Sequence, residues 1–215
     1  MEAVETTRAR TAVEAVVFDL GGVLIDWNPR YLYRQLFDGD DAAMEAFLTG
    51  ITTQEWNARQ DGGRTWAEAV AELAERHPEQ RDLIEAYRER WEEMLGGPIA
   101  GTVEVLRELR DAHVPLYALT NWSAETFPIA RDRYEFLGWF QGVVVSGEVR
   151  LVKPDAAIFH HLMERFGLEA PSTLFIDDHE PNIGAARALG IQAIRFRDPA
   201  HLRTELTDLG LLPPG

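Results

Sequence analysis

VVFDLGGVL, residues 16–24, runs from an apolar strand into a glycine turn through a single carboxylate, Asp19. The apolar residues before Asp19 are typical of a buried strand, and the glycines after it allow the backbone to turn sharply. Burial of an unpaired charge is costly, so a carboxylate at the end of such a strand requires a compensating partner. This placement favours a nucleophile or a metal ligand over a purely structural residue.

Outward from this stretch, short apolar runs alternate with segments that carry apolar residues at helical spacing. Parallel strands that alternate with helices form right-handed βαβ units. The pattern therefore predicts an α/β fold with a mainly parallel, Rossmann-like sheet. We expect strands over 12–18, 114–119, 143–145, 173–176 and 192–195, and helices over 102–112, 155–166 and 182–189.

One long interval interrupts this alternation, because residues 29 to about 95 have almost entirely helical patterns. Within it, Thr65 and Glu68 have the spacing of a capping box. We predict a small helical domain inserted after the first strand, with glycines at 21–22 and 96–97 as hinges. The expected organisation is an α/β core over 12–27 and 98–215, a helical cap domain over 28–97 and a polar N-terminal tail over 1–11.

The composition limits the classes of function open to the chain. Its 21 basic and 36 acidic residues give a formal net charge of −15, which disfavours nucleic acid or an anionic membrane as a partner. It has no cysteine, which excludes disulfides, thiolate zinc sites and cysteine nucleophiles. No apolar run approaches the ~18 residues of a membrane span, and the polar first residues differ from a secretory signal. We expect a cytoplasmic protein that is a monomer or a homodimer.

Polar side chains follow the predicted strands at the points where they end. They are Asp19, the pair Thr120-Asn121, Lys153 before a helix, and the pair Asp177-Asp178. The carboxyl ends of parallel strands lie at one edge of a sheet, so these groups are expected to meet there. The carboxylates suit Mg²⁺, a hard cation that also binds phosphates, and the hydroxyl, backbone N–H groups and lysine suit a phosphate.

The order of these groups resembles the four sequence motifs of the haloacid dehalogenase superfamily, over about residues 12–200. The matching residues are Asp19-Leu20-Gly21-Gly22-Val23, Thr120-Asn121, Lys153-Pro154, and Asp177-Asp178 with Asn182. Each motif alone is a weak signal, whereas four in this order at predicted strand ends are a strong one. The helical insertion is similar to the C1 cap of subfamily I, and the first motif is an Asp-Leu-Gly-Gly variant. The resemblance implies a hydrolase with a Rossmann-like core.

The resemblance also implies a role for each matching residue. The expected catalytic residues are Asp19, as the nucleophile that forms an aspartyl-phosphate, with Thr120 and Lys153, which bind the phosphate. Asn121 is expected beside them in the substrate site. The expected Mg²⁺ ligands are Asp19, the main-chain carbonyl of Gly21, Asp178 and, as a further ligand or a supporting residue, Asp177.

The chain departs from the family pattern at Gly21, where most phosphatases of the family carry a second aspartate. That aspartate protonates the leaving group and activates the hydrolytic water, a contribution of roughly 10²–10⁴ in rate. Two candidates to replace it are Asp26, in the flap that follows, and His179, beside the predicted metal ligands. Alternatively the substrate has a good leaving group, as an anomeric sugar phosphate does.

Four of the six tryptophans divide into two groups. Trp27, in the flap, and Trp122, after the second motif, are expected to line the substrate pocket. Trp66 and Trp91 fall on apolar helical faces and are expected in the core, because large aromatic side chains dominate packing.

Three functions remain open from the sequence. The first is a Mg²⁺-dependent hydrolase of small phosphorylated metabolites, such as a sugar phosphate. The second is a 2-haloacid dehalogenase, in which Asp19 displaces halide from a halogenated acid without metal. That branch resembles Ser-Ser-Asn where this chain has Asp177-Asp178-His179, and two adjacent carboxylates without a cation would repel each other. The third is a catalytically silent protein of this fold that binds a partner or a phosphorylated ligand.

Overall fold

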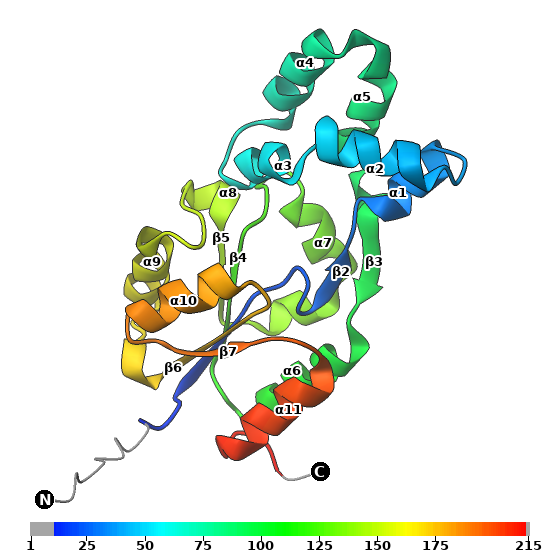
Figure 1. The fold of residues 1–215 in the computed structure, drawn as a ribbon. Coiled ribbons are helices and arrows are strands. Elements are labelled where there is room, and N and C mark those ends of the chain that lie inside the picture. Colours follow the sequence, from blue (N-terminus) through cyan, green and yellow to red (C-terminus); the bar gives the residue numbers. More distant parts are fainter. Residues whose placement is uncertain (1–10, 214–215) are drawn as a thin grey trace, which may run out of the picture.

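A parallel five-stranded sheet forms the centre of the computed structural model, which describes residues 11–213. The strands are β1 (Ala15–Phe18), β4 (Leu116–Thr120), β5 (Gly142–Val145), β6 (Thr173–Asp177) and β7 (Gln192–Arg195). They lie in the order β5-β4-β1-β6-β7, and every neighbouring pair is parallel (Figure 1). The expected α/β fold with a parallel sheet is confirmed. The predicted N-terminal tail lies outside the described residues except for Thr11.

Helices cover both faces of this sheet (Figure 1). They are α6 (Ala100–Asp111), α7 (Phe127–Arg133), α8 (Ser146–Val149), α9 (Ala156–Phe166), α10 (Glu180–Ala188) and α11 (Pro199–Asp208), with 3₁₀ turns η3 (Glu135–Trp139) and η4 (Ala170–Ser172). Neighbouring strand residues face opposite sides. Val17 and Phe175 belong to an apolar cluster with α9 and α10, whereas Val16 and Leu174 belong to one with α6 and α11. Burial on both faces explains the continuous apolar runs in the sequence.

Residues 28–94, which we call the helical segment, lie beyond the edge at which β4 and β5 end (Figure 1). Its elements are α1 (Arg30–Leu36), α2 (Asp41–Gly50), α3 (Gln54–Asp61), α4 (Trp66–Arg76), η1 (Pro78–Gln80), α5 (Arg81–Glu89) and η2 (Trp91–Met94). The expected capping box is present at the start of α4, where Thr65 Oγ1 accepts from the Glu68 N–H and donates to its carboxylate. Trp56, Trp66 and Tyr87 pack at ring separations of 5.2–5.5 Å in the segment's core. No helix within residues 11–213 is long and apolar enough to cross a bilayer.

A two-stranded antiparallel ribbon joins the helical segment to the sheet. It consists of β2 (Ile25–Trp27) and β3 (Leu95–Pro98). We expected Gly96-Gly97-Pro98 to end the helical pattern as a hinge, and instead these residues form most of a paired strand. Glycine permits this pairing, since a Cβ at Gly96 would lie 2.5 Å from Asp26 Oδ2 and Gly97 has a φ of +118°.

Candidate active site

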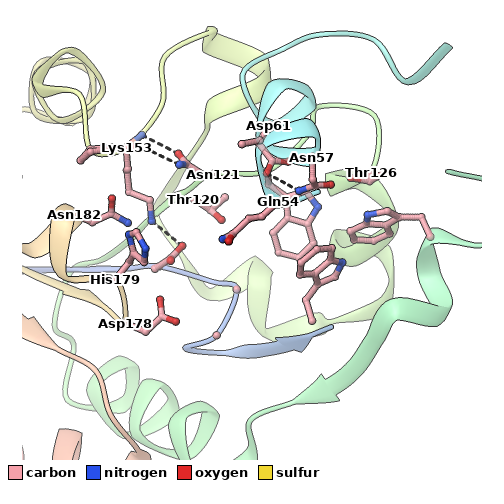
Figure 2. Close-up of a pocket in the computed structure, with 18 residues that line it drawn as sticks. Gln54, Asn57, Asp61, Thr120, Asn121, Thr126, Lys153, Asp178, His179 and Asn182 are labelled. Carbon is pink, nitrogen blue, oxygen red and sulfur yellow. Dashed lines mark hydrogen bonds and ion pairs between the residues drawn. The ribbon is translucent and has the colours of Figure 1, made fainter. Parts of the chain in front are cut away.

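A cavity of about 390 Å³ lies between the carboxyl ends of the strands and α3 of the helical segment (Figure 2). Its position follows from the parallel sheet, because the strands all end at the same edge. Of the residues expected in the site, those that line it are Asp19, Gly21, Trp27, Thr120, Asn121, Trp122, Lys153, Asp178 and His179. The structure thus brings groups from widely separated parts of the sequence to one cavity wall.

Lys153 links the carboxylates of two neighbouring strands. Its Nζ lies 2.9 Å from Asp19 Oδ1 and 2.7 Å from Asp177 Oδ2, and it donates to the Leu119 carbonyl at 2.9 Å. The side chain is 1% exposed, and Lys153 is the single lysine of the chain. Burial lowers the pKa of Lys153, but Asp19 and Asp177 outweigh it and raise the pKa above its ordinary value. The ammonium group therefore stays charged beside Asp19.

Asn121 holds the backbone of Lys153 in place. Its Nδ2 donates to the Lys153 carbonyl, and its Oδ1 accepts from the Lys153 N–H, both at 2.9 Å. We expected this amide to contact substrate, and in the structure it also clamps the loop that carries the lysine (Figure 2). The position of the ammonium group is therefore fixed twice, by the hydrogen bonds of Asn121 to the Lys153 backbone and by the oxygen atoms that contact Nζ.

Asp177 and Asp178 are adjacent in sequence but differ in environment. Asp177 is fully buried, and its two oxygens accept from Lys153 Nζ, Asn182 Nδ2 and the His179 N–H at 2.7–3.0 Å. Asp178 is exposed and lines the cavity. Its carboxylate packs against Gly22, where a Cβ would lie 2.6 Å from Asp178 Oδ2. Asp178 is thus the accessible carboxylate of the pair.

The carboxylates at this edge form a set of oxygen donors suited to a hard cation. One oxygen each of Asp19, Asp177 and Asp178 lie within 4.8 Å of one another. Burial, followed by the charge of Asp177, raises the pKa of Asp19 to about 7 against the opposing effect of Lys153. Partial desolvation at the cavity wall, followed by the charge of Asp177, also raises the pKa of Asp178. Carboxylates this close favour protonation unless a cation joins them, and an all-oxygen donor set fits Mg²⁺.

The two expected substitutes for the missing aspartate have different positions. His179 lines the cavity on the side of Asp178, whereas Asp26 does not belong to the cavity lining. The Asp26 carboxylate accepts instead from the Tyr31 hydroxyl at 2.5 Å. The pairing of β2 with β3 shifts register between Asp26 and Trp27, and of these two residues it is Trp27 that lines the cavity. Our expectation for Asp26 is therefore corrected.

Aromatic side chains form another part of the wall. Trp27 and Trp122 line the cavity as expected. Trp91, expected only in the core, is buried and lines the cavity as well, at a ring separation of 5.6 Å from Trp122. Trp66 lies in the core, and its indole N–H donates to Ser123 Oγ at 3.0 Å.

Sequence reasoning missed the polar face of α3 that closes the cavity. Gln54, Asn57 and Asp61 line it, together with Thr126 from the loop after β4 (Figure 2). Their positions i, i+3 and i+7 place the three residues on one helix face. The spacing of these three residues is visible in the sequence. A polar helix face is most often exposed to solvent, so the spacing alone did not predict that it lines a cavity.

Comparisons with known proteins agree with this architecture. Residues 13–190 match the family model of haloacid dehalogenase-like hydrolases. The chain is 27% identical over 199 residues to the sesquiterpene phosphatase astK of Aspergillus oryzae, covering 93% of this chain and 97% of that protein. It resembles the crystal structure of the family enzyme bt-2542 from Bacteroides thetaiotaomicron in complex with magnesium and inorganic phosphate. That likeness has a TM-score of 0.66 and 26% identity, covering 89% of this chain and 99% of that one.

A dehalogenase has a similar fold. The L-2-haloacid dehalogenase from Xanthobacter autotrophicus, with chloropropionic acid covalently bound, matches at a TM-score of 0.63 and 19% identity, covering 94% of this chain and 85% of that one. The fold alone therefore does not separate phosphate from halide chemistry, and the residues in the cavity must do so.

Proposed function

The chain belongs to the haloacid dehalogenase-like hydrolases, and we propose that it is a Mg²⁺-dependent hydrolase of small phosphorylated metabolites that works through an aspartyl-phosphate. The observation that carries this proposal is the cluster of Asp19, Asp177 and Asp178 around the buried Lys153 at one end of the cavity. A dehalogenase that displaces halide without metal has no need for Asp178, an accessible carboxylate next to the nucleophile.

In the proposed reaction, Asp19 attacks phosphorus and forms the acyl-phosphate, which water then hydrolyses. Lys153 balances the charge of Asp19 and of the phosphoryl oxygens, with Thr120 at the end of β4 as a hydroxyl donor to the phosphate. Asp19, Asp178 and the Gly21 carbonyl would hold Mg²⁺, which when bound neutralises charge on the transferring phosphoryl group.

Of the two roles expected for Asp177, its contacts favour the supporting one. Its oxygens already accept from Lys153, Asn182 and the His179 N–H, and it is fully buried. We assign Asp177 to the positioning of Lys153 and Asp178 to the metal. Asn121 supports the same lysine through its backbone.

We assign the helical segment the role of a cap. Gln54, Asn57 and Asp61 of α3 face the catalytic groups across the cavity. A wall in this position excludes water during phosphoryl transfer and contacts the leaving group. The cavity volume of about 390 Å³ and its mixture of indole faces and amides suit a small polar leaving group, such as a sugar.

Gly22→Ala is expected to weaken Mg²⁺ binding about tenfold or more, because the new Cβ would displace the Asp178 carboxylate 2.6 Å away. Gly39→Ala is the matched control, since Gly39 has a similar positive φ of +82° and no heavy atom lies within 4 Å of a Cβ there. Calorimetric titration with Mg²⁺ alone measures both, and circular dichroism checks folding. Equal Mg²⁺ affinity in the two folded variants would argue against Asp178 as a ligand.

A product-release panel tests the proposed reaction itself. With Mg²⁺ present, we expect inorganic phosphate from sugar phosphates and other small phosphate monoesters, and no halide from 2-chloropropionate. Phosphate and halide are measured in the same samples, with heat-denatured protein as the blank. Halide release without phosphate release would favour the dehalogenase, and neither product from a broad panel would favour a silent binding protein.

A further inference from the structure

We propose that Asp61, on α3, is the general acid and base of the hydrolysis, in place of the aspartate that the chain lacks at Gly21. This inference rests on the proposed function. The inference concerns the source of the proton for the leaving group, because neither Asp19 as nucleophile nor Lys153 as counter-charge supplies one. A Cβ at Gly21 would meet no heavy atom within 4 Å, so the space that the usual side chain would enter is open to a group from the opposite wall.

Hydrogen bonds aim the Asp61 carboxyl at the cavity. Asn57 Nδ2 donates to Asp61 Oδ2 at 3.1 Å, and the backbone N–H of Ser123 faces the same carboxyl. The Tyr87 hydroxyl donates to Asn57 Oδ1 at 3.2 Å, which fixes the orientation of the amide. Figure 2 shows Asp61 and Asn57 on the wall opposite Asp178. An acid on that wall would face the leaving group, because a phosphoryl group attacked by Asp19 would lie between the two carboxyls.

The end of α3 that carries Asp61 is fixed to the α/β part of the chain. The Asp61 carbonyl accepts from Ser146 Oγ of α8 at 2.5 Å, and that oxygen in turn accepts from the Trp122 N–H at 2.9 Å. Gly63, which follows, has a φ of +96°, and a Cβ there would lie 2.9 Å from Arg150 Cγ. This close packing holds the acid at a set distance from the strand ends, as proton transfer requires.

The surroundings of Asp61 raise the pKa of its carboxyl, so that a large fraction of it carries a proton in neutral solution. Burial raises its pKa to about 7, against a smaller opposing effect of the Ser123 N–H. Within the described residues no cationic side chain pairs with it, since Arg59 pairs with Glu55 and Arg88 lies beside Glu125. A pKa near the working pH suits a group that donates a proton in one step and accepts one in the next.

The other carboxyl groups of the cavity lining are already assigned. Asp19 is the nucleophile, and Asp178 lies on the metal side with His179 next to it. Asp26 is turned away and accepts from Tyr31. Asp61 is the carboxyl group that remains on the leaving-group side.

The proposed steps balance as follows. Asp19 Oδ forms a bond to phosphorus as the bond to the leaving oxygen breaks, and that oxygen keeps the electron pair and takes the proton of Asp61. In the second step a water oxygen attacks phosphorus and its proton passes to the Asp61 carboxylate. The acyl-phosphate bond breaks with its electrons returning to Asp19, inorganic phosphate departs, and Asp61 is again protonated.

The test is Asp61→Asn assayed with phosphate esters of increasing leaving-group pKa. For alkyl phosphates we expect kcat/KM to fall about 100-fold, because the alkoxide then leaves unprotonated. For p-nitrophenyl phosphate kcat/KM should change less than about threefold, since that leaving group needs no proton. Its kcat should fall, with a burst of nitrophenol, because hydrolysis of the aspartyl-phosphate loses its base. Glu55→Gln, on the solvent side of α3, is the matched control and should follow the wild type on every ester.

Gly21→Asp in the Asp61→Asn background should restore alkyl phosphate hydrolysis at least about tenfold, by supplying an acid from the first motif.

Folding is checked by thermal unfolding. An aspartate whose pKa is raised from 3.8 to about 7 on folding lowers stability as pH rises through that range, so Asp61→Asn should gain more Tm over wild type at pH 8 than at pH 4.

An equal loss on alkyl and aryl esters, or no loss on either, would overturn the role of Asp61. A wild type without metal-dependent phosphate release would instead overturn the proposed function on which it rests.

Discussion

Asp19→Asn is expected to reduce phosphate release about 10⁴-fold or more, the largest effect of any single substitution in the site. An amide oxygen is a poor nucleophile, and the variant also removes the negative charge that lies 2.9 Å from Lys153 Nζ. The substitution keeps the shape of the side chain, and its amide oxygen still accepts from the Leu20 N–H, which donates to Asp19 Oδ1 at 2.7 Å. The fold should therefore persist while turnover is lost.

The measurement is phosphate release at saturating Mg²⁺, with circular dichroism and thermal unfolding as checks of the fold. Asp82→Asn, an exposed aspartate on α5, is the matched control and should retain wild-type turnover. A folded Asp19→Asn protein with more than about one tenth of the wild-type rate would show that a different group attacks phosphorus.

The central sheet could be predicted because its strands are apolar on both faces and its helices have clear periodicity. The strand β3 could not, because Leu95–Pro98 contains two glycines and a proline, residues that disfavour strands when considered alone. Its pairing with β2 depends on the close approach of Asp26 to Gly96, a contact between residues 70 positions apart in sequence (96 − 26). Local propensity contains no information about such a contact.

The meeting of the candidate site residues at one edge was predictable for the same reason as the sheet. Asp19, Thr120 and Asp178 each follow or end a strand, and parallel strands bring their carboxyl ends together. The resemblance implied Asp178 as a metal ligand but left Asp177 open as a further ligand or a supporting residue, since adjacent positions look alike until the hydrogen bonds of one are known. In the structure the bonds from Lys153 and Asn182 distinguish them.

The wall formed by α3 was beyond sequence reasoning. Asn57 and Asp61 lie on a polar helix face, and the packing of α3 against α4 and α8 turns that face toward the strand ends. For Asp26, proximity in sequence to the nucleophile was misleading, because its carboxylate accepts from Tyr31 and it is Trp27 of β2 that lines the cavity.

Removal of divalent metal is the second large expected effect. The carboxylates of Asp19 and Asp178 lie in one cluster, and Lys153 supplies a single positive charge to it. Without a further cation the raised pKa of Asp19, about 7, leaves much of the nucleophile protonated at neutral pH. We expect chelation to reduce turnover about 10³-fold or more, because both the nucleophile and the transferring phosphoryl group lose their main compensating charge.

The most direct measurement uses purified protein dialysed against a chelator and divided in two, with Mg²⁺ returned to one half. Phosphate release from p-nitrophenyl phosphate and chloride release from 2-chloropropionate are followed in both halves. The proposed function predicts phosphate release only in the half with Mg²⁺ and chloride release in neither. Chloride release that survives chelation, or phosphate release that does not depend on metal, would contradict it.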